Sequence, residues 1–382
     1  MHMHEEGKPL ANILPAMIPA RSTAMSRLLF ALCFFSSTVV LSAQSGSTFP
    51  VNGTPDVRAE LHVFEGASLH LADGTVVSGG HVVVRRGRIE AVGTGVYNSE
   101  EPLVRHDLSG RHVYPAFVDV HSGWGLKRGE RSRWDGQPHY EREDTKAALG
   151  WNSALHPEFN SAESFVPSEK EANEYRSAGF GAVLTHRQDG IVRGSATLVA
   201  LSKDAHDAVL IPNSASWHSF SKGSSPQAYP SSLMGSIALL RQTFCDAEWY
   251  GQFEAPEERN LSLEAFNDGL NRPHFFEAGS WLDVLRADLI GDEFGMQYAF
   301  LGGGEAYRRL EELAATGGAL IVPLDFPTAI DVSDPYLARL VSLSEMKHWE
   351  WAPHNPAKVV EAGIPMALTM EGVSKGKTFL AN

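Results

Sequence analysis

From Pro115 to the end of the chain, apolar runs of strand length alternate with segments of helical periodicity, a pattern that constrains the fold more than any other feature. A strand, a helix and a second strand in succession form a parallel βαβ unit. The pattern predicts strands at 113–121, 180–186, 272–278, 296–302, 319–325 and 364–370. It predicts helices near 168–178, 231–249, 258–270, 280–294, 305–316 and 334–349. We therefore expect an α/β protein with a (β/α)8 TIM-like barrel, whose site lies at the C-terminal ends of the strands.

Shorter, turn-rich strands precede the barrel, between Leu61 and Val113. Dipeptides that favour tight turns separate them, namely Asp73-Gly74, Gly79-Gly80 and Arg86-Gly87. This spacing predicts a small antiparallel β unit. The expected domains are an N-terminal extension with a signal peptide at 1–43, a β-sandwich-like unit at 44–112 and the barrel at 113–382.

Two regions interrupt the alternation of strands and helices. Residues 122–165 carry three tryptophans and many charges, and they predict a long insertion after the first barrel strand. Long loops of this kind are often functional. Residues 189–220 predict extra strands that form a hairpin on the barrel.

The charge balance narrows the range of partners. The chain has 382 residues, of which 43% are apolar, and a formal net charge of −14. It has no block of Lys and Arg, which argues against a nucleic-acid partner and against binding to an anionic membrane surface. We expect a small-molecule or peptide-like ligand instead.

The N-terminus predicts export. Arg27 is followed by the uncharged run 28–41 and then by Ser42-Ala43-Gln44, the pattern of a secretory signal cut after Ala43. The run is too short for a membrane helix, so we expect no membrane span after cleavage and a periplasmic or secreted location. Both Met1 and Met25 can serve as the start.

Two stretches of the sequence carry a family resemblance. "LADGTVVSGGHVVVRRGRIEAVGTG" and "HDLSGRHVYPAFVDVHS" resemble the start of the amidohydrolase superfamily, especially its imidazolonepropionase-like and dihydroorotase-like branches. The resemblance implies a β-sandwich followed by a barrel. It also implies metal-dependent hydrolysis of C–N bonds in cyclic amides or of peptide-like bonds.

Two further stretches resemble a secreted bacterial subgroup of that superfamily. "FGAVLTHRQDGIVRGSATLVAL" and "YPSSLMGSIALLRQTFCDAEWY" are similar to a polypeptide that carries two amidohydrolase-like units. The resemblance implies that this chain is the first unit and that the second unit is its partner. Because only twelve residues follow the strand at 364–370, we expect a barrel that is incomplete at its C-terminus and a natural sequence that continues past Asn382.

The residues at the expected strand ends depart from the family's metal-binding pattern. His121 matches the first histidine of the family's His-x-His pair, but Gly123 occupies the second place and offers no ligand. Glu277 stands where the family has a strand-five histidine, and Met370 stands where it has the strand-eight aspartate. The resemblance therefore implies that most of the metal site is missing.

Five residues remain candidates for a site. His121 and His186 are candidate metal ligands or relics of them, and strand-end residues with local hydrogen bonds are the alternative. Glu277, Asp325 and Glu371 are candidate catalytic carboxylates that could join them around a hard cation, although carboxylates at helix starts are also ordinary caps.

Three hypotheses follow for the function. The first is a metal-depleted unit without a cofactor, which has a structural or substrate-binding role beside an active unit. The second is an active hydrolase with a rearranged mononuclear site that binds zinc or another divalent metal. The third is an exported solute-binding module that uses the barrel mouth, with residues 122–165 as its lid.

Overall fold

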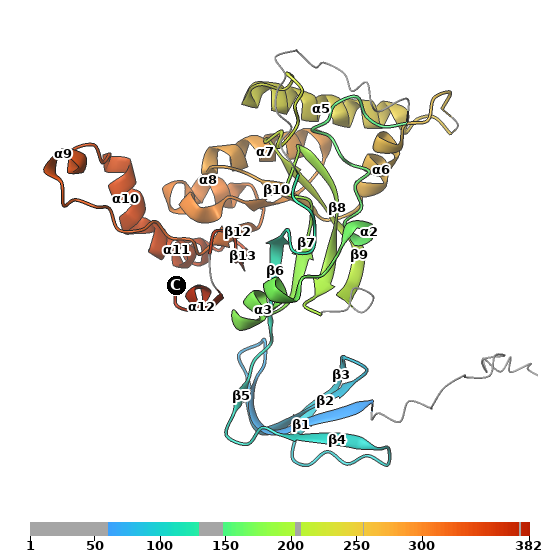
Figure 1. Ribbon diagram of the computed structural model, residues 1–382, viewed down its shortest axis with the longest axis vertical. Coiled ribbons are helices and arrows are strands. Elements are labelled where there is room, and N and C mark those ends of the chain that lie inside the picture. Colours follow the sequence, from blue (N-terminus) through green and yellow to red (C-terminus); the bar gives the residue numbers. More distant parts are fainter. Residues whose placement is uncertain (1–59, 130–147, 203–207, 255, 374–375) are drawn as a thin grey trace, which may run out of the picture. The chain divides into compact units, whose positions relative to one another are not determined.

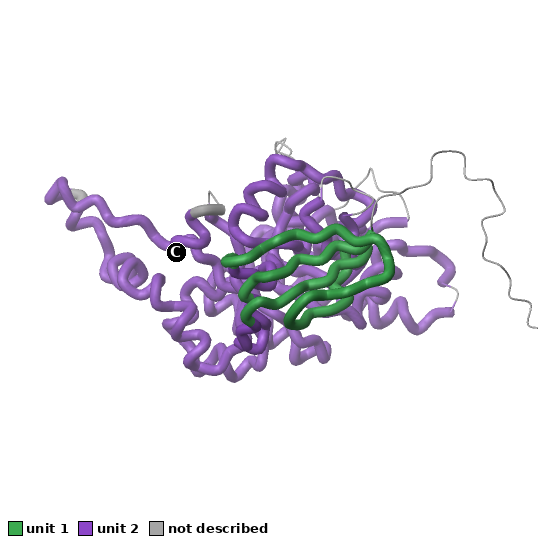
Figure 2. Tube along the Cα trace, turned by 90° about the horizontal axis from the view of Figure 1, so that it is seen from below, with its two compact units in different colours: residues 1–68, 78–111 green, residues 69–77, 112–382 purple. Residues whose placement is uncertain are grey.

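The computed structural model describes residues 60–129, 148–202, 208–254, 256–373 and 376–382. The chain forms two compact units, one from residues up to 68 together with 78–111, and one from residues 69–77 and 112–382 (Figure 2). The expected signal peptide and its cleavage site at Ala43 lie outside the described residues, as do residues 130–147 of the expected insertion.

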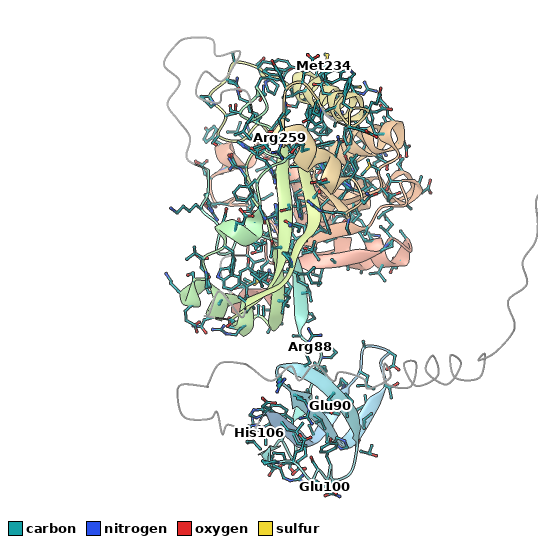
Figure 3. The ribbon with its side chains drawn as sticks, turned by 90° about the vertical axis from the view of Figure 1, so that its right-hand side faces the viewer. Arg88, Glu90, Glu100, His106, Met234 and Arg259 are labelled. Carbon is teal, nitrogen blue, oxygen red and sulfur yellow. The ribbon has the colours of Figure 1, made fainter. Side chains whose placement is uncertain are left out.

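The first unit is built on one sheet. The strands of this sheet are β1 (Leu61–His70), β2 (Val76–Arg85), β3 (Arg88–Thr94), β4 (Leu103–Asp107) and the short β5 (His112–Val113), whose two residues fall in the ranges of the second unit. They run in the order β3-β2-β1-β4, and β5 pairs with β1. Leu61, Val63 and Val83 form its buried core, whereas side chains such as Arg88 and Glu100 face solvent (Figure 3).

The turn predictions for this sheet succeed in part. Arg86 and Gly87 join β2 to β3 with positive φ angles of 48° and 76°, as a two-residue hairpin turn requires. Gly74 lies in the connection between β1 and β2 with φ 84°. The prediction of a turn at Gly79-Gly80 is wrong, because both glycines lie inside β2.

The second unit contains an eight-stranded sheet that curves into a barrel (Figure 1). Its strands are β6 (Phe117–Ser122), β7 (Phe180–Thr185), β8 (Val192–Ala200), β9 (Val209–Ser219), β10 (His274–Glu277), β11 (Tyr298–Leu301), β12 (Leu320–Pro323) and β13 (Met366–Thr369). They follow one another around the sheet in chain order. All neighbouring pairs are parallel except the two that include β8.

The first and last barrel strands lie beside each other. The backbone N–H of Met370 donates to Asp119 Oδ2 at 3.0 Å, and Thr369 Oγ1 donates to the carbonyl of His121 at 3.4 Å. Phe379, in the short helix α12 (Gly376–Phe379), packs its ring 5.0 Å from that of Phe180. The described residues therefore bring the two ends of the sheet together, although the sequence led us to expect an open edge there.

The hairpin predicted on the barrel is part of its wall. β8 and β9, from the region 189–220, are adjacent strands of the sheet, and β8 runs antiparallel between β7 and β9. Its residues are buried almost without interruption, which is typical of a strand covered on both faces. The outer cover comes in part from α2 (Ser161–Ser164) and residues 155–160 of the insertion, which reach β8 through isolated bridges.

Helices cover the outside of the sheet (Figure 1). They are α3 (Glu169–Ser177), α5 (Leu233–Tyr250), α6 (Leu261–Gly269), α7 (Trp281–Phe294), η1 (Gly303–Arg308), α8 (Leu310–Ala315), η2 (Ala352–His354) and α11 (Asn355–Glu361). Two further helices, α9 (Pro335–Ala338) and α10 (Leu343–Trp351), extend away from the sheet in Figure 1, and α10 has no buried residue. The single helices predicted at 305–316 and 334–349 are each broken in two, and the pattern did not indicate α11. None of the helices in the described part of the chain is both long and apolar enough to cross a membrane.

Two apolar layers hold the barrel together. Inside it, Leu184, Ala196, Trp217 and Ile321 pack together with partly buried Phe275. Outside it, a larger cluster joins alternate residues of the strands, such as Phe276 and Phe300, to α5, α7 and α8. Successive side chains of each strand therefore enter different layers, as strand geometry requires.

His218 of β9 belongs to the outer layer and predicts a pH dependence of stability. It is 2% exposed, and its Nδ1 has no hydrogen-bond partner among the described residues. Burial, reinforced by the nearby His274, lowers its pKa well below 6.5. Below pH 6.5 the unfolded chain therefore takes up a proton that the folded chain excludes, and His218 costs up to about 1.4 kcal/mol of stability per pH unit.

We expect His218→Phe to make the stability loss below pH 6.5 less steep, because phenylalanine packs among the same rings and does not titrate. Urea unfolding of both proteins at several pH values between neutral and mildly acid measures the slopes. Equal slopes for the two proteins would contradict the prediction.

Candidate functional site

The carboxyl ends of β6 and β7 bring two histidines together inside the barrel. His121 and His186 are 3% and 0% exposed, and Nδ1 of the first lies 2.9 Å from Nε2 of the second. Each stands at the end of a parallel strand, where the side chains of neighbouring strands meet. The two candidate ligands are therefore neighbours, as the sequence suggested.

Hydrogen bonds fix the protons on these rings. His186 Nδ1 lies 2.9 Å from the carbonyl oxygen of Arg187, so it carries a proton and donates it. Burial, followed by the charges of His121 and Arg193, lowers the pKa of His186 well below 6.5, so its ring is neutral and Nε2 accepts from His121 Nδ1. This contact uses Nδ1 of His121 and leaves Nε2 as the remaining nitrogen of its ring.

Gln188 contacts that remaining nitrogen. Its side-chain Nε2 lies 3.0 Å from His121 Nε2. The same side chain fills the space beside Gly123, because a Cβ built on this glycine would lie 2.7 Å from Gln188 Oε1. Gln188 thus stands where a second histidine would project, and it covers the atom with which the first would bind a metal.

Aromatic packing holds the histidine pair in place. The ring of Trp217 lies parallel to that of His186, with centroids 3.8 Å apart and an interplanar angle of 1°. Phe275 in turn stacks on Trp217, with the centroids of the two rings 4.9 Å apart. A fully buried tryptophan therefore fills the barrel interior beneath the mouth.

Glu277 is paired with a buried arginine. Arg193 Nη1 donates to Glu277 Oε2 at 2.6 Å, and its Nε donates to the carbonyl of Gly190 at 3.0 Å. The arginine side chain is 2% exposed and the glutamate side chain 33%. Burial opposes ionisation of Glu277, but Arg193 outweighs it and lowers the pKa of this carboxyl below its usual value. This carboxylate therefore serves as the counter-ion of Arg193.

The other two candidate carboxylates are more open. Glu371 Oε2 lies 3.4 Å from His121 Nε2, and this contact, with a further contribution from Arg128, lowers its pKa against the effect of burial. Its side chain is 55% exposed. Asp325 follows β12, is exposed, and lies against Gly372.

Asp119 is held by the backbone of the first and last barrel strands. Its two carboxylate oxygens accept the backbone N–H groups of His121 and Met370, each at 3.0 Å. Burial raises the pKa of this carboxyl, while the two N–H donors act in the opposite direction. Asp119 therefore joins the first and last strands, one repeat below His121.

A cavity of about 270 Å³ opens above the histidine pair. Its charged lining has both signs: Lys127 and Arg128 are cationic, Asp189 and Glu371 are anionic, and Gln188 also lines it. Asp189 is held by Arg187 and by the N–H and hydroxyl of Ser224. The barrel mouth is therefore small, polar and charged.

The residues present do not fit the divalent metal that the fold resemblance implies. His121 and His186 bond to each other, Gln188 covers the remaining nitrogen, and Glu277 is bound to Arg193. In the described part of the chain, no group of three His, Cys, Asp or Glu side chains converges as a metal site. No step that uses a metal can be derived from this geometry.

Sequence reasoning missed the residues that change the site. Gln188 and Arg193 were not candidates, because both lie in the region interpreted as a loop and a hairpin outside the barrel wall. The available signal was their position, since Gln188 follows the end of β7 by three residues and Arg193 is the second residue of β8. Residues just beyond a strand end lie at the barrel mouth.

The fold can be compared with solved structures. An amidohydrolase from Thermotoga maritima MSB8 aligns over 83% of this chain and 80% of its own, with 20% identity and a TM-score of 0.61. A prolidase complexed with N-methylphosphonate-L-proline covers 81% and 78%, with 13% identity and a TM-score of 0.41. Ochratoxinase from A. niger covers 83% and 77%, with 11% identity and a TM-score of 0.38. No protein-family model and no curated protein matches the chain.

Of these three structures, the Thermotoga amidohydrolase has the highest TM-score, and at 20% identity the likeness concerns the fold alone. It agrees with the eight-stranded sheet and its helical cover, and it confirms the fold class that the sequence predicted. The chain therefore shares its barrel fold with the Thermotoga maritima structure, and a small β unit is encoded before the barrel.

Proposed function

We propose that this chain is an amidohydrolase-fold unit that binds a small polar ligand at the barrel mouth and does not hydrolyse it with metal-activated water. The observation that carries the proposal is the position of Gln188, which fills the space beside Gly123 and lies 3.0 Å from His121 Nε2. A ligand set for a catalytic zinc needs three side chains with free donor atoms and an open position. Here His121 and His186 contact each other, Gln188 covers the other nitrogen of His121, and Glu277 is bound to Arg193.

The lining of the mouth supports a ligand that carries both charges. Lys127 and Arg128 can receive a carboxylate, and Glu371 can receive an ammonium group. The volume of about 270 Å³ lies near the lower end of small-molecule sites. A zwitterion of the size of an amino acid or dipeptide fits these features.

Two parts of the proposal rest on sequence. The resemblance to a tandem subgroup supports an active amidohydrolase-like unit as the partner, for which this unit would bind substrate or serve as a scaffold. The uncharged run after Arg27 supports export to the periplasm or the medium.

Metal content tests the proposal. We expect the purified full chain, dialysed without chelator, to contain well under one equivalent of zinc, iron or manganese by elemental analysis. The matched variant Gly123→His/Gln188→Gly removes the obstructing amide and supplies a second histidine on the same strand edge, so its zinc affinity should rise at least about tenfold.

One result would overturn the proposal. Stoichiometric metal in the unmodified chain, lost on His121→Ala, would show that the ligands rearrange around a cation. That outcome would favour the hypothesis of a mononuclear hydrolase built from His121, His186 and the neighbouring carboxylates.

A further inference from the structure

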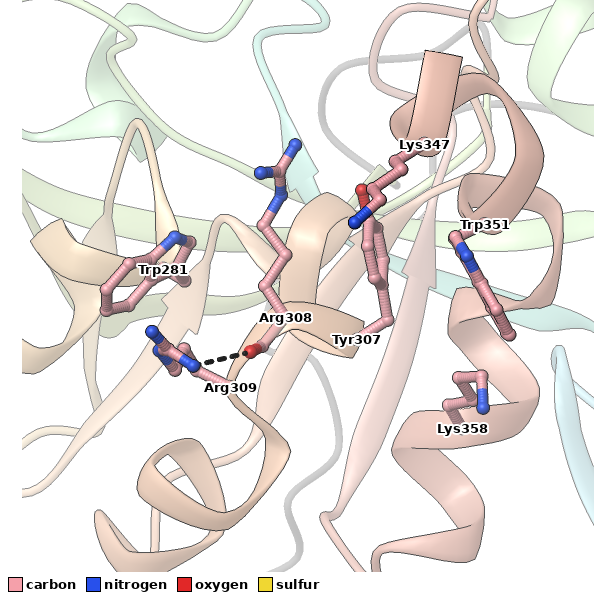
Figure 4. A pocket seen from close by; sticks show the side chains of 7 residues that line it. All are labelled: Trp281, Tyr307, Arg308, Arg309, Lys347, Trp351 and Lys358. Atoms are coloured by element: carbon pink, nitrogen blue, oxygen red, sulfur yellow. Dashed lines mark hydrogen bonds between the residues drawn. The ribbon is translucent and has the colours of Figure 1, made fainter. Parts of the chain in front are cut away.

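A second cavity, of about 430 Å³, lies among the connections that follow β10, β11 and β12 (Figure 4). It shares no lining residue with the cavity at the barrel mouth. Four cations line it, namely Arg308, Arg309, Lys347 and Lys358. No carboxylate is among the described residues that line it, in a chain whose net charge is −14. A local excess of positive charge on an acidic chain is a specific feature that focuses anions.

The cations are only loosely neutralised. Arg308 lies 3.4 Å from Glu305, and Arg309 lies 3.6 Å from Glu312, whereas Arg193 is 2.6 Å from its partner. Within the described ranges, neither lysine of the cavity has a carboxylate within ion-pair distance. The cavity therefore keeps a surplus of positive charge.

Arg308 is the least satisfied of these cations. Its Nη1 and Nη2 each lie 3.4 Å from the hydroxyl of Ser344, and Nη2 also lies 3.4 Å from Glu305 Oε1, so all of these contacts are long. Its Nε is buried and has no hydrogen-bond partner among the described residues. A guanidinium has five N–H donors in a planar fork that matches carboxylate and phosphate groups. The unmet donors of Arg308 point to an anionic acceptor.

Aromatic rings position the cations. The charged end of Arg309 lies 5.3 Å from the ring centre of Trp281, and that of Lys358 lies 4.8 Å from the ring centre of Trp351. In Figure 4 the side chain of Arg308 extends between Trp281 on one side and Tyr307 with Lys347 on the other. The rings limit the freedom of the long side chains, so less entropy is lost when an anion binds.

We propose that this cavity binds a small anion with at least two negative charges, carried by phosphate or carboxylate groups. Arg308 receives one charged group through its planar fork, and Lys347 and Lys358 receive another. The apolar or flat part of the ligand lies against the tryptophan rings. A volume of about 430 Å³ accommodates a ligand up to the size of a mononucleotide.

Calorimetric titration of the full chain with pyrophosphate, citrate and AMP tests this proposal. We expect at least one of the three to bind, and to bind more weakly as ionic strength rises. A comparison of the affinities for pyrophosphate and citrate separates recognition of phosphate from recognition of carboxylate. A comparison of AMP with uncharged adenosine measures the contribution of the phosphate charge to affinity. Arg308→Gln should weaken binding at least about tenfold, because it removes charge-assisted hydrogen bonds.

Two lysine variants form a matched pair. Lys347 lies on the exposed surface of α10, so Lys347→Gln should leave the fold intact and weaken anion binding several-fold. Lys170→Gln on α3 is the control, because it removes the same charge elsewhere and should leave the binding affinity unchanged. The proposal would be overturned if none of the three probes bound, or if Lys170→Gln weakened binding as much as Lys347→Gln. Because the two cavities share no residue, this outcome is independent of the metal content and of the barrel mouth.

Discussion

Glu277→Gln should lower the free energy of unfolding by about 3 kcal/mol, because it leaves the guanidinium of Arg193 buried without a counter-ion. Arg193 is 2% exposed, and arginine cannot relieve the cost by losing its proton. The substitution keeps the shape of the side chain, so the loss reports the charge. Urea unfolding at neutral pH, with the m-value unchanged, measures it.

Two further variants show whether the loss of stability in Glu277→Gln comes from the buried charge or from altered packing. Arg193→Met/Glu277→Leu removes both charges and should recover most of the loss, because a buried ion pair is often replaceable by apolar side chains. Glu293→Gln, which breaks the exposed pair with Arg241, should cost less than about 1 kcal/mol. Equal losses for Glu277→Gln and Glu293→Gln would contradict the prediction.

The effect of Glu277 should also depend on pH. Its folded-state pKa lies below the ordinary value of 4.5, so the stability that ionisation contributes is complete above pH 4.5 and disappears as the pH falls through the folded-state pKa. The difference between the wild-type chain and Glu277→Gln should therefore shrink below pH 4.5. A difference that stays constant down to strongly acid pH would exclude the ionised pair as its cause.

Asp119→Ala should destabilise the barrel by about 3 kcal/mol and loosen the junction between its first and last strands. The variant deprives two buried backbone N–H groups, those of His121 and Met370, of their acceptors, and each costs about 1–3 kcal/mol. Burial raises the pKa of Asp119, so removal of this carboxyl also relieves a desolvation cost. The net loss should therefore be smaller than the sum of the largest costs for the two N–H groups. Urea unfolding gives the loss of stability, and hydrogen exchange at Met370 reports the junction.

Asp107→Ala is the matched control for this variant. Asp107 accepts the N–H of the residue two positions later, as Asp119 does, but it is exposed on the β unit. Water replaces its carboxylate there, so the loss should be much smaller than that of Asp119→Ala. Asp119→Asn, which keeps one acceptor oxygen, should fall between the two. Unchanged exchange at Met370 in Asp119→Ala would show that another contact joins the strands.

Much of the fold could be predicted because its signals are local. The strands at 180–185, 298–301 and 366–369 each appear as a short apolar run, and α7 begins after a capping serine, Ser280, and ends at Gly295 with a left-handed φ of 68°. Periodicity and capping depend on neighbours in sequence. The hairpin of β8 and β9 was predicted, but its insertion into the wall through the pairing of β8 with β7 was not, because an unbroken apolar run does not show which strands lie beside it.

The sequence by itself determined that Gly123 offers no ligand beside His121 and that Met370 offers no carboxylate, since these facts depend only on residue type. Only the tertiary structure decided what replaced them. Gln188 reaches His121 across 67 residues and Arg193 reaches Glu277 across 84, and both contacts depend on the register of β7 and β8 within the wall. Shifting a strand by one residue would turn each of these side chains to the other face, so barrel closure fixes the chemistry of the mouth.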